Sequence, residues 1–295
     1  MPIVLATISR ALEGPPGIWD WDEFRKFLFS RGVLEGVAIT IMLSVTAQIV
    51  GSLIGLGLYF LRRSRFIMFR GFANFYIWIF RGTPLIVQVV LFWQLFPFLR
   101  IGNTLDQAFN FKAQFGLTNE YFVSGLLGAL LALALNEGAY MSEIVRAGID
   151  AIDVGQLEAA KSLGMTYGQG MRRIVIPQAL RIIVPPLGNE FNSMLKSSSL
   201  ASAASVLELY QVTLSYGRAT GSWITFIVIA LFWYLTLTSI WGFIQSRIER
   251  RLNLSNIDPS QLSKVPWWRR MFGAGIKDTV APEPPEVALP LSDRR

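Results

Sequence analysis

Uncharged residues lie along the chain in long blocks rather than at scattered positions. Four blocks contain no Asp, Glu, Lys or Arg: Gly36–Leu61, Gly82–Leu99, Tyr121–Asn136 and Ala219–Ser246. A helix needs about 20 consecutive apolar residues to cross a bilayer. The first and last blocks therefore predict spanning helices by themselves. The two middle blocks predict spans if they extend into neighbouring segments that carry a charge.

The composition agrees with a membrane protein, since 52% of the 295 residues are hydrophobic and only 16% are charged. The sequence has no Cys and no His, which removes disulfides, thiolate and imidazole chemistry and most zinc sites. It has no G-x-x-x-x-G-K-[ST] loop, so any use of ATP would depend on another chain. Because no nucleophile arrangement stands out either, we expect a protein that is not an enzyme.

The positive charges alternate along the chain. Lys and Arg are frequent in segments 62–81 and 146–181 and again after the last block, and they are sparse between these places. Because Lys and Arg are retained on the cytoplasmic side of short loops, both segments are predicted to lie inside the cell. The N-terminus is then extracytoplasmic and the C-terminus cytoplasmic.

The charge-rich segment 146–181 and the charge-poor turn near residue 218 lie on opposite sides of the membrane only if another span lies within segment 181–218. That segment contains three charged residues, Glu190, Lys196 and Glu208. Charges are costly in hydrocarbon, so such a span must face protein or water. We expect a pore-facing helix, broken near Pro185, Pro186 and Gly188, where discontinuous backbone can line a cavity. The alternative is that residues 190–208 form a surface loop.

Three regions follow from these patterns. Residues 1–30 are expected to be an N-terminal extracytoplasmic segment, and residues 31–251 a transmembrane domain. Residues 252–295, which are rich in Pro and charge, are expected to be a disordered cytoplasmic tail. Small residues four positions apart, Gly51 with Gly55 and Gly125 with Ala129, would allow close packing of spanning helices.

Segment 155–181 interrupts the apolar chain with Gly and positive charge. Residues 157–163 are good helix formers, and Glu158 can pair with Lys161 at i, i+3. Gly164 predicts the end of this helix. A second short helix is predicted over residues 167–176, with Pro177 constraining its end. We name residues 155–181 the coupling segment.

The coupling segment has two interpretations from its residues alone. Ala159 and Ala160 offer a small-residue surface that the groove of another protein could approach closely. Alternatively, the segment lies on the membrane with its basic residues against anionic lipid. The local pattern does not choose between docking and lipid contact.

A resemblance favours docking. The spacing Glu158-Ala159-Ala160, three residues, Gly164, nine residues, Ile174-x-Ile176-Pro177 resembles the EAA motif of permease subunits of bacterial ABC importers. Ile176 stands where Leu is usual. The stretches "FRGTPLIVQ", "GAYMSEIVRAGI" and "PPLGNEFNSMLKSSSL" resemble the polar amino acid group of these permeases, the histidine, glutamine and glutamate type.

The resemblance implies an all-α transmembrane protein of about five spans with a cytoplasmic helix-turn-helix, the type I ABC importer permease fold. It implies a bacterial inner membrane and a second permease chain, identical or related. It also implies two ATPase subunits that bind ATP and Mg and an extracytoplasmic amino-acid-binding protein, with no nucleic acid. The residues it assigns to ATPase coupling are Glu158, Ala159, Ala160, Gly164, Ile174 and Pro177.

The substrate path is expected where polar groups lie at membrane depth. The candidates are Asn136, Tyr140, Asn189, Glu190 and Lys196. A zwitterionic amino acid needs acceptors for its ammonium and donors for its carboxylate, which Glu190 and Lys196 could supply. Alternatively, Lys196 snorkels to the interface, and Glu143 pairs with Arg146 as a structural bridge. In the "RGTP" turn, Arg81 and Pro84 are expected to set the entry of the second span.

Two other classes remain open on sequence alone. A secondary transporter coupled to ions would show repeated hydropathy halves, and we see no such repeat. A channel-like membrane protein would use the coupling segment to bind lipid. The predicted function is the transmembrane subunit of an ATP-driven importer of a polar amino acid.

Overall fold

The computed structural model describes residues 19–98 and 120–252, and every regular element within these two ranges is a helix. The helices are α2 (Trp21–Phe27), α3 (Arg31–Arg62), α4 (Ile67–Gly82), α5 (Leu85–Phe98), α8 (Glu120–Asp150), α9 (Val154–Ser162), α10 (Tyr167–Gly170), α11 (Ile176–Ser197), α12 (Leu209–Thr220) and α13 (Trp223–Arg251). A π-helical turn, Met171–Val175, precedes α11, and a 3-10 helix, Ser198–Ala204, follows it. The tail expected over residues 252–295 lies outside the described residues, apart from residue 252.

Three helices are long and apolar enough to cross a membrane: α3, residues 124–150 of α8, and α13. Helices α4 and α5 together make a fourth candidate span, which is bent by 108° between them. Helix α11 has 22 residues, so it is about 33 Å long, sufficient for a fifth pass. It is less apolar than the others because it carries Arg181, Glu190 and Lys196.

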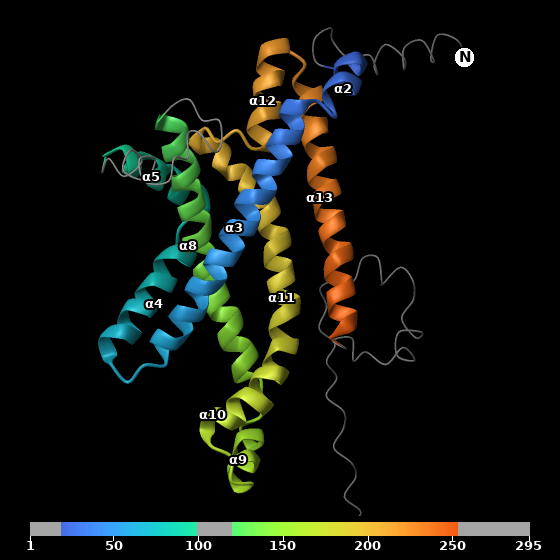
Figure 1. Ribbon diagram of the computed structural model, residues 1–295. Helices are drawn as coiled ribbons and strands as arrows, with labels where there is room; N and C mark the ends of the chain where they lie inside the picture. Colours follow the sequence, from blue (N-terminus) through green and yellow to red (C-terminus); the bar gives the residue numbers. More distant parts are fainter. Residues whose placement is uncertain (1–18, 99–119, 253–295) are drawn as a thin grey trace, which may run out of the picture. The chain divides into compact units, whose positions relative to one another are not determined.

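The contacts between helices fix their directions. Gly51 and Gly55 of α3 face Glu137 and Met141 of α8, so α3 and α8 run parallel. Helices α11 and α13 run antiparallel. Trp241 of α13 binds the carbonyl of Gly188, and Gln245, four residues further along α13, binds the carbonyl of Pro185, three residues back along α11. The start of α11 and the end of α13 therefore lie at the same end of the helices (Figure 1).

The α3–α8 contact depends on the small residues that the sequence singled out. A Cβ added at Gly51 would lie 2.6 Å from Cβ of Glu137, and one at Gly55 would lie 2.8 Å from the main-chain nitrogen of Ser142. Real Cβ atoms do not approach other atoms so closely, so these positions admit only glycine without a shift of the helices. The predicted close packing of spanning helices is confirmed here.

The block 82–99 does extend into a neighbouring charged segment, as a span there required, but the span is bent. Most of segment 62–81, which was placed on the cytoplasmic side because of its arginines, belongs to α4, and the helix direction changes at Thr83 and Pro84. Proline has no N–H to donate to the carbonyl four residues earlier, which here belongs to Phe80. The chain therefore bends at the place where the loop-to-helix boundary was expected.

The fourth span also differs from the prediction. Helix α11 continues through Pro185 and Pro186 without a break, and the irregular backbone comes later, in the 3-10 helix that ends at Ser205 with φ of 58°. Side chains of α13 support the proline-bearing turn: Trp241 Nε1 donates to the carbonyl of Gly188 at 2.8 Å, and Gln245 Nε2 donates to that of Pro185 at 3.3 Å.

The alternative of a surface loop over 190–208 is wrong. Glu208 is fully buried and caps the start of α12, because its carboxylate accepts hydrogen bonds from the backbone N–H groups of Tyr210 and Gln211. It also accepts a 2.8 Å hydrogen bond from the Tyr234 hydroxyl of α13.

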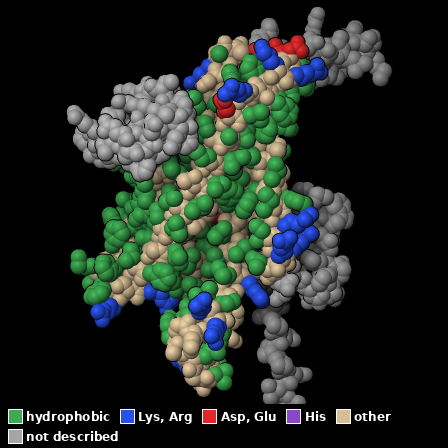
Figure 2. All heavy atoms as spheres, in the orientation of Figure 1, with side chains coloured by type: hydrophobic (Ala, Val, Ile, Leu, Met, Phe, Trp, Pro, Cys, Tyr) green, Lys and Arg blue, Asp and Glu red, His purple; other side chains and the backbone are tan. Residues whose placement is uncertain are grey.

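On the face shown in Figure 2, hydrophobic side chains cover the middle of the described helices and Lys and Arg gather toward the ends.

Candidate functional site

The coupling segment is built mainly from local capping interactions. Helix α9 begins at the N-cap Asp153, whose carboxylate accepts from the N–H of Gly155 at 2.8 Å. It ends in a Schellman motif: Gly164 adopts φ of 80°, its N–H reaches the carbonyl of Lys161, and the N–H of Met165 reaches that of Ala160. The predicted break at Gly164 is confirmed.

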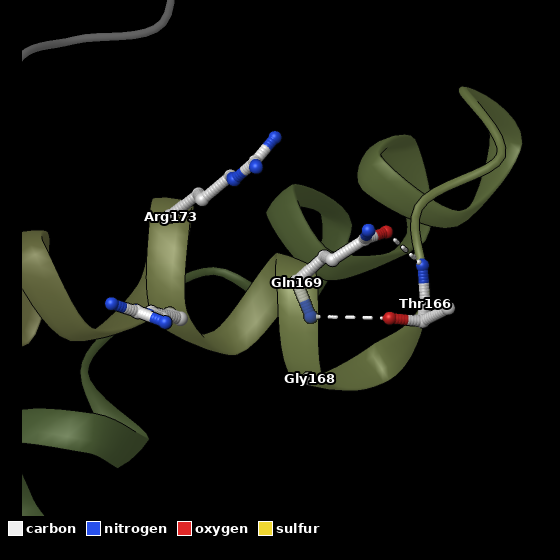
Figure 3. A pocket seen from close by; sticks show the side chains of 5 residues that line it. Thr166, Gly168, Gln169 and Arg173 are labelled. Carbon is white, nitrogen blue, oxygen red and sulfur yellow. Dashed lines mark hydrogen bonds between the residues drawn. The ribbon is translucent and has the colours of Figure 1, made fainter.

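The next helix starts with a capping box. The Thr166 hydroxyl accepts from the Gln169 N–H at 3.3 Å, and the Gln169 side chain accepts from the Thr166 N–H at 2.9 Å (Figure 3). Asp153, just before the segment, and residues of the segment itself thus satisfy both helix starts and the turn between them. The element is preformed without a partner chain.

Pro177 does not end the second helix, contrary to the prediction. The chain passes from α10 through the π-helical turn Met171–Val175 into α11, with Pro177 in the first turn of that helix. The N–H of Ile176 reaches the carbonyl of Met171, five residues back. A proline in a helix has no backbone N–H to donate, and its ring crowds the carbonyl four residues earlier. The π-helical turn therefore falls where Pro177 interrupts the regular helical hydrogen bonds.

The small residues of α9 point in different directions. Glu158 and Ala159 are exposed, whereas Ala160 is only 1% exposed. A Cβ added at Gly170 would lie 3.4 Å from the Ala160 Cβ and 2.8 Å from the Leu157 Cδ1. Ala160 therefore packs α9 against the following helix, and the expected docking surface of two alanines reduces to Ala159.

The remaining residues assigned to coupling differ in exposure. Ile174 is half-buried in the π turn, and Pro177 is exposed. The expected Glu158–Lys161 ion pair is absent from the part of the chain that the structure describes.

A hollow of about 560 Å³, lined by Thr166, Gly168, Gln169, Arg172 and Arg173, lies beside the capping box (Figure 3). Its two arginines make this side of the segment positive.

A network of ion pairs joins the C-terminal ends of α3 and α8, next to the coupling segment. Arg62 binds Glu143, Arg146 also binds Glu143 at 2.8 Å, and Arg146 reaches Asp150 at 3.2 Å. Glu143 thus has the structural role that was weighed against a place in the substrate path. The network ties the ends of two parallel helices just before α9 begins.

A second group of polar side chains lies between the spans. Glu137 of α8 is 4% exposed and accepts a 2.8 Å hydrogen bond from Gln48 Nε2 of α3, while the Gln48 Oε1 is buried without a partner among the described residues. Glu190 of α11 is close enough to Glu137 for their charges to interact. The Arg81 guanidinium lies 5.2 Å from the centre of the Tyr140 ring and acts electrostatically on Glu190. We call Gln48, Arg81, Glu137, Tyr140 and Glu190 the polar cluster.

Of the five predicted path residues, Tyr140 and Glu190 belong to the polar cluster. Asn136 supports the α4–α5 bend instead: its Nδ2 donates to the Phe80 carbonyl at 2.8 Å and to Gln88 Oε1 at 3.1 Å. Gln88 Nε2 also donates to Phe80, at 3.0 Å. These two amides replace the donor that Pro84 lacks.

The last two predicted path residues lie apart from the polar cluster. Asn189 is exposed and its Oδ1 accepts from Gln245 of α13. Lys196 is exposed and lies six residues beyond Glu190, so the two side chains point roughly 120° apart around α11.

Sequence reasoning missed three members of the polar cluster as site residues, Gln48, Arg81 and Glu137. A signal existed for the first, because Gln48 is a polar residue inside a charge-free block of 26 residues, and polar groups at membrane depth are costly without a purpose. The meeting of Arg81 with Tyr140 depends on the bend at Pro84 and carries no sequence signal. Within the described ranges, no group of three or more acidic side chains could hold a metal ion.

Comparison with known proteins agrees with this architecture. The family model "Binding-protein-dependent transport system inner membrane component" matches residues 51–254. The arginine transport system permease protein ArgU of Corynebacterium glutamicum is 41% identical over 223 residues, which are 75% of this chain and 68% of that protein. The arginine transport system permease protein ArtQ of Bacillus subtilis is 36% identical over 220 residues, 75% of this chain and 92% of that one.

Solved structures give the same result. The crystal structure of an amino acid ABC transporter with histidines matches with a TM-score of 0.63 and 35% identity, covering 79% of this chain and 98% of that chain. A chain of the inward-facing MetNI methionine ABC transporter matches at 23% identity with a TM-score of 0.56, covering 77% and 96%, and this likeness concerns the fold alone. The chain therefore belongs to the inner-membrane component family of binding-protein-dependent transport systems, with the type I fold of ABC importer permeases and its similar relatives among the amino acid permeases.

Proposed function

We propose that this chain forms the translocation path of an ATP-driven amino acid importer and receives its energy through the coupling segment. The chain works with two ATPase subunits, which bind ATP and Mg, with a second permease chain of the same or a related sequence, and with an extracytoplasmic binding protein. The N-terminus is extracytoplasmic and the C-terminus cytoplasmic, as the alternation of positive charge favours.

The exposed, preformed coupling segment is the observation that carries this proposal. It joins the end of α8 to the start of α11, so any displacement of the segment acts on two spanning helices at once. The ion pairs of Glu143 extend that connection to α3. An element that is closed by its own caps can bind a partner with little loss of conformational entropy, and it can pass a rigid-body movement onward.

Individual residues take distinct roles in coupling. Glu158 and Ala159 form the contact face, since both are exposed on α9. Ala160 and Gly164 shape the segment, the first by packing against Gly170 and the second by its left-handed turn. Ile174 and Pro177 connect the segment to α11 through the π turn.

An amino acid is the substrate class that fits the polar cluster and the relatives' names. Carboxylates at Glu137 and Glu190 offer acceptors for an ammonium group, and Tyr140 offers an aromatic face for a cation. We place Tyr140 and Glu190 on the path, with Asn136, Asn189 and Lys196 at its borders. Such groups are retained at membrane depth where they serve transport.

The test is a Trp placed on the contact face. In Ala159→Trp, a bulky side chain on an exposed position should leave folding intact but prevent the close approach of the ATPase groove, so co-purified ATPase subunits and substrate-stimulated hydrolysis fall at least tenfold. Ala219→Trp is the matched control, because Ala219 is also exposed but lies at the end of α12. Its complex should retain the ATPase.

The outcomes separate coupling from the other classes. If Ala159→Trp transports amino acid at the parental rate in a reconstituted complex, the assigned contact face is wrong. If the wild-type chain purifies without any ATPase and supports uptake driven by an ion gradient alone, the importer proposal itself fails. Uptake of acidic, neutral and basic amino acids in the same vesicles identifies the substrate.

A further inference from the structure

The polar cluster contains two carboxyl groups and one guanidinium, contributed by three different spans. Glu137 is held from α3 by Gln48, and Glu190 lies on α11 within electrostatic range of Glu137. Register supports this meeting, since Ser44 Oγ of α3 lies 3.4 Å from the Met194 carbonyl of α11. Moving four residues along antiparallel helices brings Gln48 and Glu190 to the same level.

Arg81 approaches this pair from the end of α4 and is held loosely. Its guanidinium rests over the Tyr140 ring with 5.2 Å between Cζ and the ring centre, and its side chain is exposed. No carboxylate of the described residues lies within ion-pair distance of it, although its charge acts on Glu190. A guanidinium in this position stabilises nearby carboxylates while remaining free to leave.

The Gln48 Oε1 is a second sign that the cluster is incomplete by itself. This oxygen is buried and has no hydrogen-bond donor among the described residues. A buried acceptor without a donor is costly, and a ligand that brings an N–H group would satisfy it. A cationic group with several N–H donors matches both the free oxygen and the two carboxyl groups.

We propose that Arg81 is a built-in counter-ion of the polar cluster, which the cationic side chain of a basic amino acid replaces when the substrate enters. This inference rests on the proposed function and names its substrate class, an amino acid with a guanidinium or ammonium side chain. Arg81 is a positioning residue: it offsets part of the negative charge of the cluster when the path is empty and competes with the substrate for Glu190. The carboxyl groups favour a cationic over a neutral side chain, and they bind it once Arg81 has moved aside.

A different role for Arg81 would give the opposite result. If its guanidinium bound the substrate carboxylate, every amino acid would lose affinity equally when Arg81 was removed, because all share that carboxylate. Competition predicts an effect on cationic substrates alone. Arginine and citrulline form the test pair, since citrulline has nearly the same shape as arginine and a neutral side chain.

The experiment measures uptake of arginine and citrulline into vesicles containing the full complex with its binding protein. In Arg81→Gln, KM for arginine should fall about tenfold while KM for citrulline changes less than twofold. Arg81→Lys, which keeps the charge, should return KM for arginine toward the parental value. Arg70→Gln is the control, because Arg70 is an exposed arginine of the same helix.

A double substitution distinguishes competition from simple repulsion of the substrate by Arg81. In Glu190→Gln the site that Arg81 contests is gone, so adding Arg81→Gln should no longer lower KM for arginine. A fall that persists in the double variant overturns the inference. So does a KM that rises equally for arginine and citrulline, or an arginine-to-citrulline ratio that does not change.

The failure of the inference and that of the proposed function look different. If the wild-type complex takes up no amino acid in the presence of ATP, both are overturned. If it takes up amino acid but Arg81→Gln leaves the arginine-to-citrulline KM ratio unchanged, only the counter-ion role fails. Retention of the ATPase by each variant is measured in parallel to establish that the complex is intact.

Discussion

The coupling segment and the polar cluster are held together in opposite ways. In the coupling segment, main-chain groups are satisfied by neighbours a few residues away, as in the Schellman motif at Gly164 and the capping box at Thr166. In the polar cluster, Gln48 meets Glu137 across 89 positions of sequence. The first region therefore keeps its shape on its own, and the second exists only when the spans are packed.

This difference separates stability from coupling. A change on the contact face of α9 removes few internal contacts, so it should alter how the chain works without altering whether it folds. A change between the spans alters the packing that brings the cluster residues together, so it should reduce the amount of folded protein first.

The largest loss of folded protein is expected for Gly55→Val. A Cβ at this position would lie 2.8 Å from a main-chain nitrogen of α8 and 2.9 Å from the Gly138 carbonyl, so the helices must separate. Overpacking of this kind costs about 1–3 kcal/mol or more. Size-exclusion yield and thermal melting in detergent measure it. Gly57→Val in the same helix is the control, since nothing lies within 4 Å of a Cβ there, and equal behaviour of the two variants would refute close α3–α8 packing.

A smaller loss is expected for Asn136→Leu. Removal of one of the two amides leaves the Phe80 carbonyl with Gln88 as its side-chain donor, and a weakened buried hydrogen bond costs about 1–2 kcal/mol. Thermal melting of the purified chain measures the change. Asn189→Leu is the comparison, because Asn189 is exposed and its cost should stay within about 0.5 kcal/mol. The support role of Asn136 is wrong if both variants melt alike.

The smallest effect on stability is expected for Gly164→Ala, which belongs to the coupling segment. The φ of 80° at Gly164 disfavours any side chain, at a cost of about 1 kcal/mol. The strain is local, so the spans should melt near the parental temperature while substrate-stimulated ATP hydrolysis falls. Gly168→Ala is the control, because Gly168 lies in a helix with open space around it. A parental hydrolysis rate in Gly164→Ala would contradict a role for the turn in coupling.

Sequence patterns predicted the features that depend on neighbours along the chain. The long apolar block before Arg62 indicated α3, and Gly164 indicated the end of α9 because a left-handed turn needs glycine. The spacing from Glu158 to Pro177 indicated the family. These signals are local, so one sequence was sufficient to read them.

Features that depend on contacts between spans were predicted less well. Pro185 and Pro186 suggested a break in α11, but the helix continues through both prolines and contacts Trp241 and Gln245 of α13. Ala160 suggested an outer surface, but Gly170 provides space for it inside. In both regions the contacts come from another helix, whose position no local pattern specifies.

The bend at Pro84 has a consequence for how this protein varies in evolution. Pro84 removes the N–H that would bind the Phe80 carbonyl, and Gln88 and Asn136 both donate to that oxygen. The three positions therefore constrain one another although one lies on a distant helix. Homologues that replace the proline should lose the two amides together, and homologues that keep it should retain at least one, so the three columns of an alignment should covary.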